Sequence, residues 1–341
     1  MKKIFYLSLM AMLMVCSKSF GQTLVATLTH GETVTFYYGD SAFVFAQRAA
    51  IHGDEILLSS GSFITLGIDK AITLRGAGME EDSLTAIAPT ILRNDCWVDI
   101  ANPGDNHLQV EGICFQHNFY FSYSNPIVQP QFSNCQFRSH IYMYSNYNQP
   151  ANVSDAVFIH CKIAYGPCNG SSYSYNATAT FINCILKGVS TNDNVFYTFR
   201  NCNIQCDARE LSDATIANCI IYNVDYGGSA VGGGFPESTH LSNCVSQSEK
   251  TFANSMNTTN KVVAMKNLFE GYSGDTFYMP TFNYKLKEAA ATTYLGVDGT
   301  QVGIWGGNLP FNAIPNGPRV KKLAVGNQQA DGKLKVTVEV Q

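Results

Sequence analysis

The chain has 341 residues, of which 45% are hydrophobic and 14% are charged, and its formal net charge is −4. A protein that holds nucleic acid usually presents a basic face, so this balance argues against a nucleic-acid partner. The 21 Phe and 18 Tyr residues supply ample apolar surface to bury, which argues against a disordered chain.

The first 21 residues are typical of an export signal. Two lysines precede an apolar stretch of residues 4–15, and small residues follow at the positions that signal peptidase reads. We therefore expect a signal peptide over residues 1–21, cleavage before Gln22, and a secreted or cell-surface protein, with the periplasm as the alternative location. The apolar stretch is shorter than the ~20 residues that span a bilayer, which argues against a membrane anchor. No other segment of the sequence could span a membrane, so we expect no transmembrane segment after the signal is removed. Lipid attachment at Cys16 is the competing interpretation.

Residues 41–50 follow the pattern of a short amphipathic helix. Residues 53–63 and 72–78 come next and are interpreted as short strands with glycine-containing turns.

A six-residue motif then recurs through the middle of the chain: apolar, any, Asn, Cys, any, apolar. Its six copies centre on Asn134-Cys135, His160-Cys161, Asn183-Cys184, Asn201-Cys202, Asn218-Cys219 and Asn243-Cys244, with successive cysteines 17 to 26 residues apart. An earlier relative carries Gly112 in the Asn position. A repeat of this length predicts a solenoid in which each unit is stable only when stacked on its neighbours.

Each copy is interpreted as two short strands that meet at a turn. Asn and Gly accept a left-handed backbone at low cost, so we expect them at the corner. Stacked coils place identical residues above one another at about 4.8 Å, and the Asn side chains are expected to hydrogen-bond along the stack as an asparagine ladder. The row that follows the turn is expected to point outward: Gln136, Lys162, Ile185, Asn203, Ile220 and Val245.

The cysteines are open to two interpretations. In an exported protein an even number usually indicates disulfides, but disulfides between stacked coils would distort strand geometry. We therefore expect one inward stack of free thiols, because free Cys packs as a small hydrophobe. No Cys or His pairs have the close spacing of a zinc site, so no metal or cofactor is expected. His160 is interpreted as a ladder residue in preference to a catalytic base.

These features resemble the pectate-lyase-like family of right-handed parallel β-helices found in secreted bacterial proteins. The resemblance implies an all-β fold: a single right-handed parallel β-helix solenoid over residues 22–309, with residues 41–50 as the N-terminal capping helix. It also implies that residues 284–286 and 298–307 form the closing coil.

A short tail follows over residues 310–341. Three prolines between residues 310 and 318 mark a linker. Residues 334–340 alternate strictly between apolar and polar, and with residues 320–325 and the turn at Asp331-Gly332 they predict a C-terminal β-hairpin.

The resemblance does not extend to a catalytic site. Glycosidases need two carboxylates that face one bond, and calcium-assisted lyases need clustered carboxylates with a base. The arginine motifs of pectate lyases and the aspartate motifs of polygalacturonases are not evident, so no catalytic residue is assigned.

Tyrosines in Ser- and Asn-rich segments are more distinctive, because a ring offers an apolar face and a polar tip to a sugar. The candidate ligand-binding residues are Tyr120, Tyr123, Arg138, His140, Tyr142, Tyr144, Tyr173 and Tyr175. The sequence thus favours a secreted or surface β-helix that binds a polysaccharide, a surface glycan or another surface partner without catalysis. The alternative is a polysaccharide lyase or glycosidase, and inward packing of half of each Tyr-rich segment is the competing structural interpretation.

Overall fold

The computed structural model describes residues 24–82, 87–122, 124–143, 152–168, 176–191, 195–224, 233–254, 259–274, 277–279, 281–315, 320–328 and 334–340. The expected signal peptide lies outside these residues, as do Tyr123, Tyr144, Tyr173 and Tyr175.

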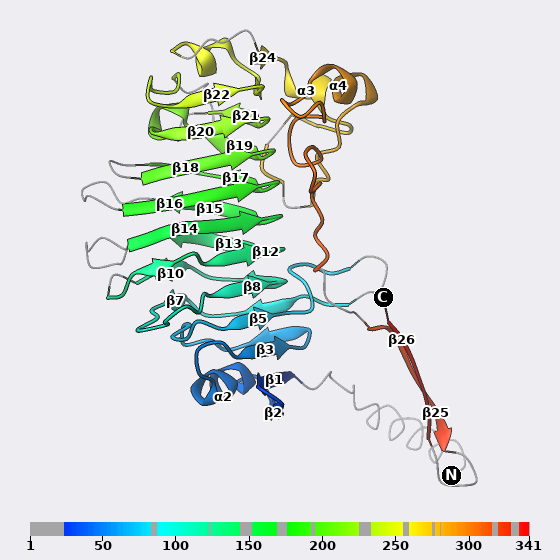
Figure 1. Ribbon diagram of the computed structural model, residues 1–341. Coiled ribbons are helices and arrows are strands. Elements are labelled where there is room, and N and C mark those ends of the chain that lie inside the picture. The colour runs from blue at the N-terminus through cyan, green and yellow to red at the C-terminus, as the bar shows by residue number, and fades with distance from the viewer. Residues whose placement is uncertain are drawn as a thin grey trace, which may run out of the picture.

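Two long sheets form the body of the protein, stacked strand upon strand (Figure 1). The first, which we call sheet A, runs in the order β2 (Thr33–Tyr38), β1 (Val25–His30), β3 (Glu55–Leu58), β5 (Thr73–Arg75), β8 (Gln109–Glu111), β12 (Gln131–Ser133), β14 (Asn152–Ile159), β16 (Asn176–Ile182), β18 (Val195–Arg200), β20 (Ala214–Ala217) and β22 (His240–Ser242), with β11 (Ile127–Val128) beside β14.

The second, sheet B, runs in the order β24 (Lys261–Val262), β23 (Val245–Ser246), β21 (Ile220–Asn223), β19 (Asn203–Cys206), β17 (Ile185–Lys187), β15 (Lys162–Cys168), β13 (Gln136–Tyr142), β9 (Ile113–Phe115), β6 (Thr90–Leu92) and β4 (Gly61–Phe63). Beside these strands, β10 (Phe119–Phe121) pairs with both β13 and β7 (Cys96–Val98).

From β12 to β23, successive strands pass from one sheet to the other, and each strand pairs in parallel with the next in its own sheet. The predicted all-β chain with long parallel sheets is confirmed. Antiparallel pairing occurs at β1, which lies between β2 and β3, and in the C-terminal hairpin of β25 (Val320–Gln328) and β26 (Leu334–Val340).

The apolar core lies between the two sheets and follows the parallel register. Phe132, Phe158, Phe181 and Phe199 stand above one another with ring centroids 4.9 to 5.0 Å apart. The six repeat cysteines are free and fully buried in the same core, as are Cys96 and Cys206. Cys114 is also free and buried, but it lies outside this core in register with Gln136. The expected inward stack of free thiols is therefore present.

The corner between the sheets has the expected backbone. All six repeat positions from Asn134 to Asn243 have φ between 50° and 58°, and Gly112 has φ 68°. Only residues that tolerate a left-handed backbone fit here, which explains why Asn recurs.

The expected helix is present at the N-terminal end as α2 (Ala42–Ala49), which buries Ala42, Phe43 and Ala46. Short helices follow elsewhere: η1 (Ala208–Glu210), η2 (Glu249–Phe252), α3 (Met265–Leu268) and α4 (Glu288–Thr293).

The described residues of the segment 263–315 do not form a closing coil, which corrects the expectation for residues 284–286 and 298–307. We call this segment the strap, because it turns back after β24 and descends along the corner of the stacked strands (Figure 1). Its backbone meets the corner residues in reverse order: Leu295 with Asn243, Val297 with Asn218, Ile304 with Asn183, Leu309 with His160, and Asn312 and Ile314 with Asn134. Of the linker expected over residues 310–318, the described residues 310–315 belong to this packed segment.

The expected asparagine ladder is not present, because five of the six corner side chains bond to the strap. Asn201 is the exception, since its Nδ2 atom is buried and has no partner among the described residues. Asn183 donates to the carbonyl oxygens of Ile304 and Gly306 at 2.7 and 2.8 Å. His160 Nε2 lies 2.9 Å from the carbonyl oxygen of Leu309, which makes this residue part of the same row. Gly112 continues the row, and a Cβ atom there would come within 2.7 Å of Pro315.

The row after the corner is covered by the strap and does not face solvent. Gln136, Lys162, Ile185, Asn203, Ile220 and Val245 are each at most 6% exposed. Ile185, Ile220 and Val245 join strap residues such as Phe269, Phe277 and Tyr284 in a second apolar core. This explains why an apolar row follows the corner outside the first core.

Candidate functional site

A continuous stack of rings runs along the outside of sheet B. Trp97 on β7 stacks on Tyr120 of β10 at 4.0 Å, and Tyr120 stacks on Tyr142 of β13 at 4.9 Å. His140 stacks on both Tyr142 and Tyr165, at 5.3 and 4.9 Å. We call Trp97, Tyr120, Tyr142, His140 and Tyr165 the aromatic row. The parallel register sets Trp97, Tyr120 and Tyr142 over one another, and it sets His140 over Tyr165. His140 and Tyr142 are two residues apart on β13 and connect the two parts of the row.

The rings point outward because side chains alternate between the core and the outer face along each strand. In β7 and β10 the flanking residues Cys96, Val98, Phe119 and Phe121 are fully buried in the core, so the central residue of each strand points away from it. Lys187 of β17 ends the row with its ammonium 4.9 Å from the centre of the Tyr165 ring.

The ring faces within the row are turned toward one another, so the row presents ring edges and polar tips. Tyr120 is only 4% exposed, whereas Tyr165 is 41% exposed. Asn118 donates a hydrogen bond to the Tyr120 hydroxyl at 3.0 Å. Burial lowers the pKa of His140 below its ordinary value, which favours the neutral imidazole at neutral pH.

The stack of rings stops at Gly67. Ile68 bridges in parallel to Val98, which puts Gly67 opposite Trp97 in the preceding coil. A Cβ atom at Gly67, whose φ is 117°, would lie 2.7 Å from the Trp97 carbonyl oxygen. No ring can follow here, and a hollow of about 370 Å³ opens beside the Trp97 indole instead.

Polar groups line this hollow together with Trp97. Gln47, Arg48, Asp69 and Asp99 contribute side chains, and the Gln47 amide donates to Asp69 Oδ1 at 2.9 Å. The Gln47 Oε1 atom is buried and has no hydrogen-bond partner among the described residues. A buried acceptor without a partner is costly, and a ligand hydroxyl would satisfy it.

The structure brings together three of the eight residues proposed from sequence: Tyr120, His140 and Tyr142. Arg138 lies on the same strand two residues before His140, is exposed, and donates from Nε to Gln136 Oε1 at 3.1 Å. The other four tyrosines lie outside the described residues. Sequence reasoning missed Trp97, although the alternation Cys96-Trp97-Val98 already indicated an outward ring.

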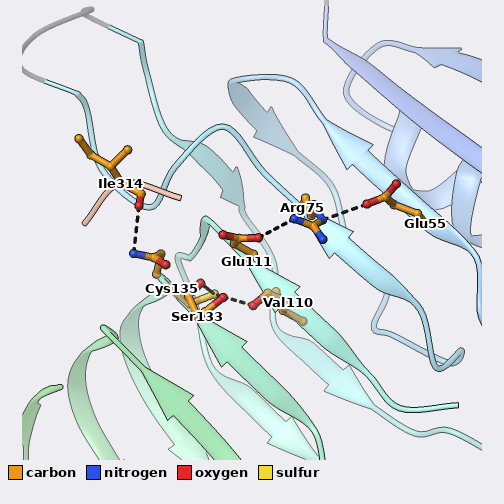
Figure 2. Close-up of polar contacts among 8 residues, drawn as sticks. Glu55, Arg75, Val110, Glu111, Ser133, Cys135 and Ile314 are labelled. Carbon is orange, nitrogen blue, oxygen red and sulfur yellow. Dashed lines mark hydrogen bonds and ion pairs between the residues drawn. The ribbon is translucent and has the colours of Figure 1, made fainter. Parts of the chain in front are cut away.

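Sequence reasoning also missed a charged network on the outer face of sheet A. Figure 2 shows Arg75 of β5 between Glu55 of β3 and Glu111 of β8, with both ion pairs at 2.9 Å. The three residues come from neighbouring strands, and only the strand register could have indicated their proximity. Arg75 and Glu111 border a shallow hollow of about 270 Å³.

Two general features concern ligands and membranes. Within the described ranges, no three or more His, Cys, Asp or Glu side chains converge as they would around a metal ion. None of the helices in the described part of the chain has the length and apolar character needed to cross a bilayer.

Comparison of the chain with protein-family models, with characterised proteins and with solved structures gives no match.

Proposed function

We propose that the protein is an exported glycan-binding protein without catalytic activity, built on a single right-handed parallel β-helix of the pectate-lyase-like kind. Alternation of successive strands between two parallel sheets supports the solenoid. Positive φ angles at every corner from Asn134 to Asn243 fit a regular coil.

The observation that carries the binding proposal is the Trp97 hollow. An indole at the end of a ring stack, next to a hollow with carboxylates and an unsatisfied amide oxygen, suits one sugar ring of a glycan. The sugar ring packs against the indole, and its hydroxyls bond to Gln47, Asp69 and Asp99. The remainder of the glycan follows the polar edges of the aromatic row toward Tyr165.

Glycan-array binding and affinity gel electrophoresis of the mature full-length protein test this proposal. Trp97→Ala is expected to weaken binding by about tenfold or more, because it removes the packing surface. Phe196→Ala is the matched control, since that ring is 55% exposed on sheet A. Gln47→Leu provides a second variant that keeps the ring stack intact and removes the acceptor. Binding to no polysaccharide, or equal binding by all variants, would contradict the proposal.

The alternative function is a polysaccharide lyase or glycosidase at Glu55, Arg75 and Glu111. The specific observation in its favour is that two carboxylates and a guanidinium meet on an outer sheet face beside a hollow. A screen of uronic-acid and neutral polysaccharides for unsaturated or reducing-end products separates the two functions. Products that disappear with Glu111→Gln favour the enzyme, and a screen without products counts against it.

A further inference from the structure

A larger cavity, of about 420 Å³, lies between sheet B and the strap, and it shares no lining residue with the Trp97 hollow. The loop after β5 contributes Gly78 and residues 80–82, while Lys162 and Ile185 form the sheet side. The strap contributes residues 281–283, 304–305 and 311–315. A space of this volume accommodates a small organic ligand.

One wall of the cavity already stabilises an ammonium group, that of the Lys162 side chain. The Lys162 side chain is only 7% exposed, and its Nζ lies 2.6 Å from Glu80 Oε2. The same Nζ stands 5.8 Å from the centre of the Phe311 ring. A carboxylate and an aromatic face together offset the cost of removing the charge from water.

The rest of the lining repeats these chemical elements. Glu81 and Asp82 add two carboxylates, so three carboxylates and one ammonium give the lining a formal charge of −2. Phe282 and Trp305 add half-buried rings. The Trp305 indole is fixed in orientation, because its Nε1 donates to the Asn283 carbonyl oxygen at 2.7 Å.

Polar groups stand at the rim of the cavity. Thr281, Asn283 and Asn312 are exposed and line it with hydroxyl and amide groups. These groups match a ligand that carries hydroxyls in addition to a positive charge.

We propose that this cavity binds an amino sugar through its ammonium group. The ammonium lies among Glu81, Asp82 and the Trp305 ring, in the environment that Glu80 and Phe311 give to Lys162, and the sugar hydroxyls face the rim. This site is separate from the glycan site at Trp97 and does not depend on it.

Calorimetric titration of the mature full-length protein with glucosamine, glucose and N-acetylglucosamine tests the ligand class. Glucosamine is expected to bind at millimolar concentration, with affinity falling as salt is added. The two neutral sugars are expected to bind about tenfold more weakly or worse, because they cannot pair with the carboxylates. Equal binding of all three sugars, or binding of none, would overturn the proposal.

Variants locate the site. Glu81→Gln is expected to weaken glucosamine binding by about tenfold, and Glu237→Gln, at an exposed acid on a turn before β22, is expected to leave it unchanged.

The chain contains two tryptophans, so Trp97→Phe and Trp305→Phe each leave a single fluorescent indole. Glucosamine should change the fluorescence of Trp97→Phe and not that of Trp305→Phe. The reverse result would move amine binding to the Trp97 hollow and overturn this assignment. Loss of glycan binding at Trp97 would not affect the assignment of amino-sugar binding to the cavity beside the strap.

Discussion

The side-chain amide of Asn183, in the turn between β16 and β17, donates a hydrogen bond of 2.7 Å to the carbonyl oxygen of Ile304 in the strap. The two residues are 121 positions apart in sequence. The amide also donates to the Gly306 carbonyl, so one side chain satisfies two carbonyl groups of a segment that has no sheet partner there. The Asn corner therefore has two roles, because it permits the left-handed turn and it holds the strap.

Substitutions of Asn183 separate these roles. Asn183→Gly keeps the backbone conformation and loses both bonds, so it should lower the free energy of unfolding by about 1–3 kcal/mol. Asn183→Ala also places a Cβ atom at φ 50°, which should cost about 1–2 kcal/mol more. Urea denaturation measures both. Equal stability of the two variants would argue against a conformational role for Asn at this corner.

Removal of a large apolar side chain from the core of the strap is expected to destabilise the strap without destabilising the two sheets. Phe269 is fully buried in the strap beside Phe277, Phe282 and Tyr284. Phe269→Ala should cost about 3–5 kcal/mol, because it leaves a cavity among those rings. Hydrogen exchange should then accelerate in residues 263–315, while the strands that hold the Phe132 to Phe199 stack stay protected.

Phe196→Ala is the control for that measurement, because Phe196 is 55% exposed and should change stability by about 0.5 kcal/mol or less. Uniform acceleration across both sheets in the Phe269 variant would mean that strap and body unfold as one unit.

Local rules predicted much of the fold. The Asn-Cys repeat indicated the corners and the inward thiols, since a left-handed turn and a period of two within strands leave little choice of side-chain direction. The helix over residues 41–50 was also predicted, and it appears as Ala42–Ala49.

The strap and the aromatic row could not be predicted from local patterns, because they depend on contacts between residues far apart in the sequence. Ile185, Ile220 and Val245 formed an apolar row expected to face solvent, and that contradiction was the sequence signal that a covering segment exists. Which segment covers them depends on contacts such as Asn134 with Ile314, 180 positions away. Trp97, Tyr120 and Tyr142 are neighbours only because their strands pair in parallel register. The loops between coils differ in length, so this register cannot be read from the spacing of the residues in the sequence.

Asn203 is the residue at which an apolar substitution should stabilise the protein. It is fully buried under the strap, in line with Ile185 and Ile220, and neither polar atom of its side chain has a partner among the described residues. Asn203→Leu removes the desolvated amide while it keeps the number and branching of the side-chain heavy atoms, and it should raise the free energy of unfolding by about 1 kcal/mol. Urea denaturation tests this. A large loss would indicate that the amide bonds to a buried water molecule.

Alkaline pH should destabilise the protein through its buried thiols. Burial raises the pKa of the Cys114 thiol from 9.0 to about 11 and that of the Cys96 thiol to about 12. The folded state keeps these protons where the unfolded state loses them, so the unfolded state binds fewer protons and the free energy of unfolding falls as pH rises. The loss begins near pH 9 and continues until the folded thiols ionise, near pH 11 for Cys114 and pH 12 for Cys96.

Denaturation under reducing conditions between about pH 8 and pH 9.5 avoids most of the ionisation of tyrosine. The double variant Cys96→Ala/Cys114→Ala should be less stable at neutral pH and lose less stability across this range. An unchanged slope would mean that the remaining thiols dominate the alkaline response.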